Sequence, residues 1–158
     1  MGCDIHLALE CKVKDKWVAV KFKNEYQEDD GREFSSRIRY PGRSYGLFNI
    51  LSYNGVRVNR EQLNFAWDER GLPEDVSDLV AAESDSSDYH THSQLTLSEM
   101  KKAIQTEQVL MVHEISQGIT DPWKGELAGF YEWAQSKTKV LLPGINESNI
   151  RIIFWYDN

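Results

Sequence analysis

The segment Cys3-Asp-Ile-His-Leu-Ala-Leu-Glu-Cys-Lys-Val-Lys14 decides the fold of this chain. Apolar residues at the odd-numbered positions alternate with mostly polar residues at the even-numbered positions for a dozen residues. A period of two is typical of a β-strand with one buried face and one open face. We therefore expect a long strand here, with Asp4 and His6 together on its open face.

Two further segments extend this strand into a sheet. Asp15-Lys16 predicts a turn, and Trp17 to Phe22 predicts a second strand that completes an N-terminal hairpin. Residues 150–156, Ile-Arg-Ile-Ile-Phe-Trp-Tyr, are mostly β-branched or aromatic and are too apolar for a solvent-exposed edge. We place this C-terminal strand beside the hairpin in an antiparallel sheet.

The middle of the chain carries helical signals. Residues 47–51 have apolar positions at helical spacing, Pro73 is placed to open a second helix, and Thr96 with Glu99 forms a capping box. A fourth helix opens at Asp121-Pro122, and its apolar face holds Leu127, Phe130, Tyr131 and Ala134. Residues 23–31 and 84–88 are polar and predict loops. The predicted fold is a single α+β domain spanning 1–158, with helices packed on one face of a small antiparallel sheet.

Composition excludes several classes of protein. The 158 residues hold 18 Lys+Arg against 25 Asp+Glu, a net charge of −7, which argues against direct nucleic-acid binding. No apolar run approaches the roughly 20 residues of a membrane-spanning helix. Cys3 and Cys11 would lie roughly 26 Å apart on one strand, against about 6 Å for a disulfide. We expect reduced thiols, no targeting signal and a cytoplasmic location.

Four residues form a candidate metal site. Asp4 and His6 share a strand face, and His90 and His92 share one too if their segment is extended. Such pairs suit a divalent metal, and an open coordination position for water would make the protein a metal-dependent hydrolase. We favour the alternative that His6 hydrogen-bonds a neighbouring strand or loop, or lines a site for another ligand. Any cofactor stays open, with a divalent metal as the candidate.

Arginines accompany the histidine motifs. Arg43 lies at the start of the helix predicted around 47–51, where the helix dipole does not stabilise a cation. An anionic ligand, or a carboxylate such as Asp4, would explain an arginine at this position. Arg57 lies beyond the end of that helix. Arg70 precedes the helix predicted at Pro73, where a guanidinium and free N–H groups could bind an anion. Internal ion pairs are the alternative in a chain with surplus acids.

Acidic residues crowd into the stretch 74–88. We interpret them as a solvated face, and as an alternative they could form a surface that binds a basic host protein. These acids are Glu74, Asp75, Asp78, Glu83, Asp85 and Asp88.

Short sequence blocks at both ends and in the middle of the chain form a recognisable pattern. The end blocks are the N-terminal Met1-Gly-Cys-Asp-Ile-His6 and the C-terminal Phe154-Trp-Tyr-Asp-Asn158. The blocks between them are Arg43-Ser-Tyr-Gly-Leu-Phe48, Gly55-Val-Arg57, Arg70-Gly-Leu-Pro73, His90-Thr-His-Ser93 and Leu95-Thr-Leu-Ser-Glu99. In this pattern the chain resembles a family of small proteins common in bacteriophages and prophages. The chain departs from the pattern at Tyr89, where a Trp or Gly is more usual. The resemblance implies a phage setting, in the host cytoplasm, and no particular reaction.

Three functions follow from these observations. The first is an accessory protein that binds a small anionic ligand, such as a nucleotide signal, and counteracts host defence by sequestering it. Its site would combine His6, His90, His92, Arg43, Arg57 and Arg70, with Tyr45 stacking on a base. The second is the metal-dependent hydrolase, and the third is an acidic inhibitor of a host protein. We rank them in this order and lean toward binding rather than catalysis.

Overall fold

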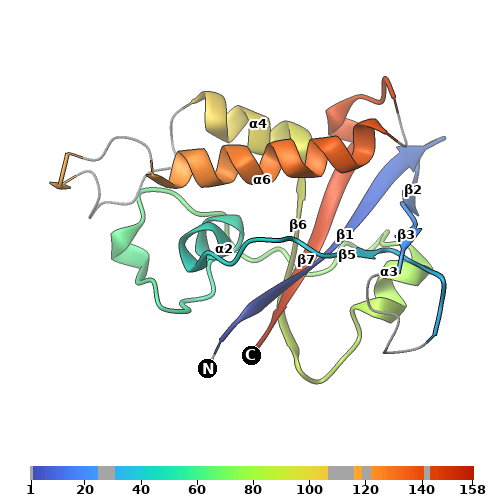
Figure 1. Ribbon diagram of the computed structural model, residues 1–158, viewed down its shortest axis with the longest axis horizontal. Helices are drawn as coiled ribbons and strands as arrows, with labels where there is room; N and C mark the ends of the chain where they lie inside the picture. The colour runs from blue at the N-terminus through green and yellow to red at the C-terminus, as the bar shows by residue number, and fades with distance from the viewer. Residues whose placement is uncertain (1, 25–30, 107–115, 119–121, 141–142) are drawn as a thin grey trace. The chain divides into compact units, whose positions relative to one another are not determined.

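The computed structural model describes residues 2–24, 31–106, 116–118, 122–140 and 143–158 (Figure 1). Two compact units divide the chain. The first is assembled from Met1–Arg43, Arg70–Gln94 and Asn149–Asn158, and the second from Ser44–Glu69 and Leu95–Ser148.

A five-stranded sheet organises the first unit. Its strands are β1 (Asp4–Val13), β2 (Lys16–Ala19), β5 (Arg37–Ile38), β6 (Tyr89–Thr96) and β7 (Ile150–Asp157). Their order is β2-β1-β7-β6, and β5 also pairs with β1. The termini run side by side, because β7 is antiparallel to β1 from Asp4↔Asp157 to Cys11↔Ile150 (Figure 1). The predicted α+β class and the antiparallel union of N-terminal and C-terminal strands are confirmed.

The N-terminal hairpin turns one residue earlier than predicted. Val13 pairs with Lys16, so Lys14 and Asp15 form a two-residue loop. Both loop residues have positive φ, 49° and 63°, as a type I′ turn requires. The strand predicted from Trp17 to Phe22 is divided, since β2 ends at Ala19. A separate two-stranded sheet joins β3 (Phe22–Lys23) to β4 (Phe34–Ser35).

The face of β1 predicted to be open is covered over its middle. Ala8 is fully buried with Ile153 and Trp155 of β7 and Val80 of the helix α3 (Asp78–Glu83). The opposite face holds Leu7 and Leu9, which are also fully buried. We call these the His6 face and the Leu7 face. Only the beginning of β1 alternates as predicted, because α3 packs on the central part of the His6 face and Val13, at the end of the strand, is 45% exposed.

A buried ion pair crosses the His6 face. Glu10 and Arg151 are directly opposed in β1 and β7, with side chains 0% and 4% exposed. Arg151 Nε donates to Glu10 Oε1 at 2.7 Å, and Nη1 donates to Asp75 Oδ1 at 2.9 Å. The Arg151 guanidinium also lies 4.1 Å from the centre of the Trp17 ring. This hydrogen bond from Arg151 lowers the pKa of Asp75.

The second predicted helix begins later than expected. Pro73 begins a turn that closes where Val76 N–H donates to the Pro73 carbonyl, and α3 begins only at Asp78. The reason is tertiary, since Ser77 N–H donates to Glu10 Oε2 at 2.8 Å and so holds the segment before α3 on the sheet. The prediction that Pro73, Glu74 and Asp75 form a first helical turn is wrong.

The second unit is helical. It contains α2 (Tyr45–Leu51), α4 (Leu97–Gln105) and α6 (Pro122–Lys139), and α4 lies beside α6 (Figure 1). Short 3-10 turns are η1 (Arg60–Gln62) and η2 (Glu147–Asn149). The capping box of Thr96 and Glu99 is present as predicted, and the apolar face predicted for the fourth helix is buried. The N-terminal signal Asp121 and most of the loop predicted at 23–31 lie outside the described residues.

No helix in the described part of the chain combines the length and apolarity needed to cross a membrane.

Replacing Arg151 with Met should lower the free energy of unfolding by about 3–5 kcal/mol, because it leaves the Glu10 carboxylate buried without its cation. Urea denaturation measures the change. The double variant Glu10→Met/Arg151→Met should lose less than Arg151→Met alone. Lys12→Met serves as the control, since Lys12 also lies over the Trp17 ring but is exposed. A loss below about 1 kcal/mol for Arg151→Met would contradict a central role for the pair.

Asp75→Asn should lower the free energy of unfolding by less than Arg151→Met, because the Asp75 carboxylate is 66% exposed. The lowered pKa fixes the direction of its pH dependence. The contribution of Asp75 is present at neutral pH and is lost as the pH falls below the ordinary carboxyl value of 3.8. The stabilities of Asp75→Asn and the unchanged protein should therefore converge in acid.

Candidate functional site

A cavity of about 270 Å³ lies in the first unit beside the beginning of β1. Its lining residues are Asp4, Ile5, His6, Arg39, Tyr40 and Gly42, and we call it the N-terminal slot. Consecutive strand residues project to opposite faces, so Asp4, Ile5 and His6 line one cavity only along the strand edge. The opposite wall is formed by Arg39, Tyr40 and Gly42. They lie beside the beginning of β1 because Ile38 pairs with Leu7 and the chain then continues antiparallel to β1.

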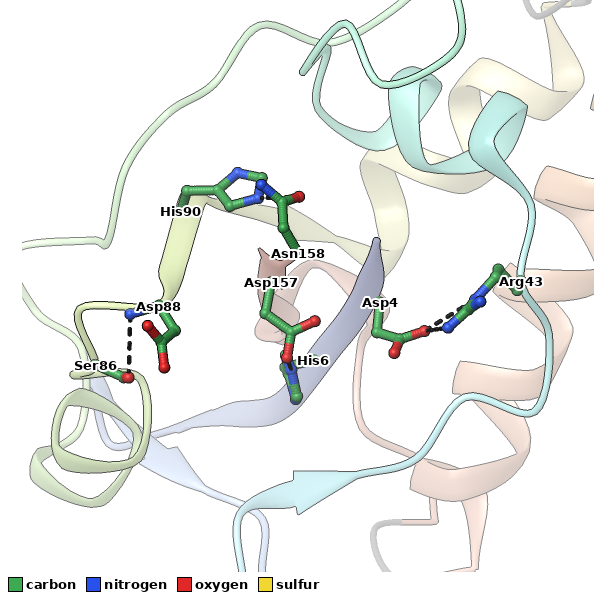
Figure 2. A network of polar contacts seen from close by, with 8 residues as sticks. All are labelled: Asp4, His6, Arg43, Ser86, Asp88, His90, Asp157 and Asn158. Carbon is green, nitrogen blue, oxygen red and sulfur yellow. Dashed lines mark hydrogen bonds and ion pairs between the residues drawn. The ribbon is translucent and has the colours of Figure 1, made fainter. Parts of the chain in front are cut away.

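Arg43 binds the carboxylate at the mouth of the slot. Its Nε donates to Asp4 Oδ1 at 2.9 Å, and its Nη2 donates to the same oxygen (Figure 2). A Cβ at residue 2 would lie 3.1 Å from Arg43 Nη1, so Gly2 lets the guanidinium approach the backbone. Asp4 is thus the carboxylate partner suggested for Arg43 from the sequence. No described residue donates to the second carboxylate oxygen, Oδ2.

His6 is held between a carboxylate and aromatic rings. Its Nε2 lies 2.8 Å from Asp157 Oδ2 (Figure 2), and its ring stacks on Trp155 at 6.1 Å and 15°. The Tyr89 ring lies 5.0 Å away. Since Nε2 faces Asp157 and Nδ1 is shielded from solvent, His6 lines the slot rather than offering a free base to it. A hydrogen bond from His6 to a neighbouring strand is the interpretation we favoured.

His90 and His92 do not share a face. The His92 ring stacks on Trp155 at 6.1 Å, whereas the His90 ring lies 6.2 Å from Tyr156, the next residue of β7. His90 Nε2 also contacts Asn158 Oδ1 at 3.1 Å (Figure 2). The alternation of side chains between the two faces of the strand is interrupted at Thr91, whose φ of 53° is unusual for a β-branched residue. The condition for a shared face, an extended segment, therefore fails.

The structure gathers only part of the set chosen from the sequence. His6 and His92 flank Trp155 on the His6 face, and Arg43 reaches the slot through Asp4. Arg70 Nη1 instead donates to the Gln94 carbonyl at 3.2 Å, and no helix starts at Pro73. The helix N-terminus on which the anion site predicted at Arg70 depended is therefore absent there.

Tyr45 and Arg57 belong to the second unit and contact each other. The Arg57 guanidinium lies 4.9 Å from the centre of the Tyr45 ring, a cation–π contact. Tyr45 is the first residue of α2, and Arg57 has a φ of 58°. Each is thus engaged within the helical unit.

The four candidate metal ligands point to different partners. Asp4 faces Arg43, His6 faces Asp157, His90 faces Asn158, and His92 Nε2 contacts the Ser84 carbonyl at 3.0 Å. Across the described ranges, no group of three or more His, Cys, Asp or Glu residues could hold a metal ion. The four side chains predicted as metal ligands therefore do not converge on a common point among the described residues.

Sequence reasoning missed Arg39, Tyr40 and Gly42. Arg39-Tyr-Pro-Gly-Arg43 places two cations around an aromatic residue and a turn-forming Pro-Gly in an acidic chain, and this was the available signal. A Cβ on Gly42 would lie 2.8 Å from Tyr40 Cε1, so the Tyr40 ring folds over a residue without a side chain. Gly42 therefore sets where the ring lies in the slot.

Neighbouring thiols and acids are not reactive candidates. Burial, followed by the charges of Asp157 and Asp4, raises the pKa of Cys3 to about 11, so the thiol is neutral.

The acidic residues at 74–88 do not all belong to the solvated face predicted from the sequence. Glu83 is buried and accepts from Ser35 Oγ and from Ser36 N–H at 3.2 Å, while Asp75 binds Arg151.

Comparison with known proteins gives no relative: no family model, no curated protein and no solved structure matches the chain.

Thr91→Gly should raise the free energy of unfolding by about 1 kcal/mol, because Gly adopts positive φ without the steric cost borne by a β-branched residue. Thermal and urea unfolding measure it. Gln94→Gly, in the same strand without positive φ, is the matched control and should be destabilising. Equal losses for the two variants would show that Thr91 bears no strain.

Proposed function

We propose that the protein binds a small anionic ligand, a nucleotide, in the N-terminal slot and acts by sequestering it. The observation that carries the proposal is the convergence of Arg39, Tyr40 and Asp4 on one cavity, with Arg43 bound to the Asp4 carboxylate. In the phage setting implied by the sequence resemblance, the ligand would be a host nucleotide signal and the protein an accessory factor that counteracts defence.

Arginine chemistry supports an anion. A guanidinium has five N–H donors in a planar fork that fits phosphate or carboxylate oxygens. Asp4 accepts from Nε and Nη2 of Arg43, and both bonds end on one carboxylate oxygen. Arg39 and Arg43 are both exposed at the slot, so a phosphate can be bound without burying an unpaired charge.

The remaining slot residues suit the other parts of a nucleotide. Tyr40 is partly exposed and presents an aromatic ring on which a base could stack. Asp4 Oδ2 is an acceptor for a hydroxyl or amino group of the ligand. The volume of about 270 Å³ lies just below the roughly 300–1,000 Å³ of sites for drug-sized molecules, which favours a compact ligand.

A panel of nucleoside monophosphates, diphosphates, triphosphates and cyclic nucleotides tests the proposal by thermal stabilisation and calorimetry. At least one should stabilise the protein, by about 2.7 kcal/mol at a hundredfold excess over Kd. Arg39→Ala and Arg43→Ala should each weaken binding by roughly tenfold to a hundredfold, as expected for lost charge-assisted hydrogen bonds.

Lys101→Ala is the matched control, because it removes an exposed cation from α4 in the second unit. It should leave the affinity unchanged. The proposal fails if no nucleotide at millimolar concentration shifts the melting temperature, or if Lys101→Ala weakens binding as much as the slot variants.

Gly42→Ala should weaken nucleotide binding several-fold with little loss of stability, because the new methyl group displaces only the Tyr40 ring. The matched control is Gly129→Ala in α6, where an added Cβ meets nothing within 4 Å. Calorimetry and thermal melting of both variants give the comparison. Unchanged affinity for Gly42→Ala would remove Tyr40 from the site.

A further inference from the structure

A second cavity, of about 330 Å³, runs along the outer side of β2 in the first unit. One wall is formed by the four residues of β2 together with Lys21, and the other by residues 75–79, which lead into α3. We call it the β2 groove. Both walls consist of nearly unbroken runs of sequence, so the groove is elongated along the strand.

The β2 groove exposes backbone as well as side chains. All of Lys16, Trp17, Val18 and Ala19 line it, and consecutive strand residues share a cavity only along the strand edge. β2 is the last strand in the order β2-β1-β7-β6, and no strand in the described part of the chain pairs with its outer edge.

The pairing register of β1 and β2 identifies which backbone groups of β2 point away from the sheet. Val20 N–H donates to the Leu9 carbonyl at 2.8 Å, and Val18 is opposed to Cys11 in the same register. Antiparallel pairs alternate between bonded and non-bonded, so Val20 and Val18 bond inward to β1. Trp17 and Ala19 therefore direct their N–H and C=O groups to the free edge.

The walls carry distinct chemistry on the two faces of the sheet. On the His6 face the groove is bounded by half-buried Val76 and Leu79 and by the exposed carboxylate of Asp78. On the Leu7 face, Val18 is 43% exposed. An added strand would thus meet apolar surface on both faces, the carboxylates of Asp75 and Asp78 on the His6 face, and the Lys16 side chain on the Leu7 face.

We propose that the β2 groove binds an extended peptide segment of a partner protein as an added strand. The peptide pairs with Trp17 and Ala19, and its residues on the His6 face are apolar around one Lys or Arg that faces Asp78. Main-chain pairing supplies affinity, and the alternate side chains supply specificity, as in other strand-addition complexes.

A second copy of this chain fits the β2 groove less well. Antiparallel self-pairing of β2 places its twofold axis perpendicular to the sheet, which keeps both α3 segments on the same face. The exposed carboxylates of Asp78 from the two copies would then lie on the same face of the joined sheet, where like charges repel. A partner segment with a basic residue has no such conflict.

The test uses two capped eight-residue peptides that differ in one residue. Both have threonine and valine alternating, and the central residue on the valine side is lysine in one and glutamate in the other. Each is titrated by calorimetry against the unchanged protein, Asp78→Lys and the control Glu74→Lys, whose exposed acid lies outside the groove lining. Amide hydrogen exchange of Trp17 and Ala19 is measured with and without peptide.

The lysine peptide should bind the unchanged protein and Glu74→Lys about fivefold more tightly than it binds Asp78→Lys, as expected for an exposed ion pair. The glutamate peptide should show the reverse preference, which a loss of folding in Asp78→Lys could not produce. Bound peptide should slow exchange at Trp17 and Ala19.

Three outcomes would overturn the proposal. These are no binding at millimolar peptide, binding that ignores the charge at residue 78, and a concentration-dependent dimer that protects the same two amides without peptide. The test does not depend on nucleotide binding, so it stands or falls separately from the function proposed for the N-terminal slot.

Discussion

The opposed pair Glu10 and Arg151 is the constraint on which the first unit depends. The two carboxylate oxygens of Glu10 accept hydrogen bonds from different donors, one from Arg151 Nε and the other from Ser77 N–H. One buried acid therefore ties together β1, β7 and the segment that precedes α3. A slip of β7 by one residue relative to β1 would turn Arg151 to the Leu7 face, among buried apolar side chains, and leave the buried Glu10 carboxylate without its cation. The pair thus specifies register as well as contributing to stability.

Register in turn builds the N-terminal slot. With Glu10 opposite Arg151, Asp4 falls opposite Asp157 and His6 opposite Trp155. Asp157 then meets the His6 ring, and the Asp4 carboxylate remains at the edge, where Arg43 reaches it. The short pairing of β5 with β1 brings Arg39 and Tyr40 to the same edge. The cavity at the beginning of β1 is therefore a consequence of pairing fixed several residues away.

Local patterns in the sequence predicted the elements whose signals are local. The period of two in β1, the capping box of Thr96 and Glu99, and the apolar C-terminal strand all describe structure visible within ten residues. The failures involve distant contacts. Pro73 does not start a helix because the following segment bonds to Glu10, far away in the chain. Thr91 carries a positive φ that no residue preference indicates, and it separates His90 from His92.

Net charge is a poor guide to this site, because acids and bases are used differently in the fold. Glu10 and Glu83 are buried and matched to internal donors, and Asp75 is bound to Arg151. They count toward the net charge of −7 but contribute little free negative potential to the surface. Arg39 and Arg43, in contrast, lie exposed in one five-residue segment. The field at the N-terminal slot is set by the charges close to it, the guanidinium groups of Arg39 and Arg43 and the carboxylates of Asp4 and Asp157, since exposed charges beyond about 10 Å are largely screened at 0.1 M salt. An acidic chain can therefore present a site for an anion.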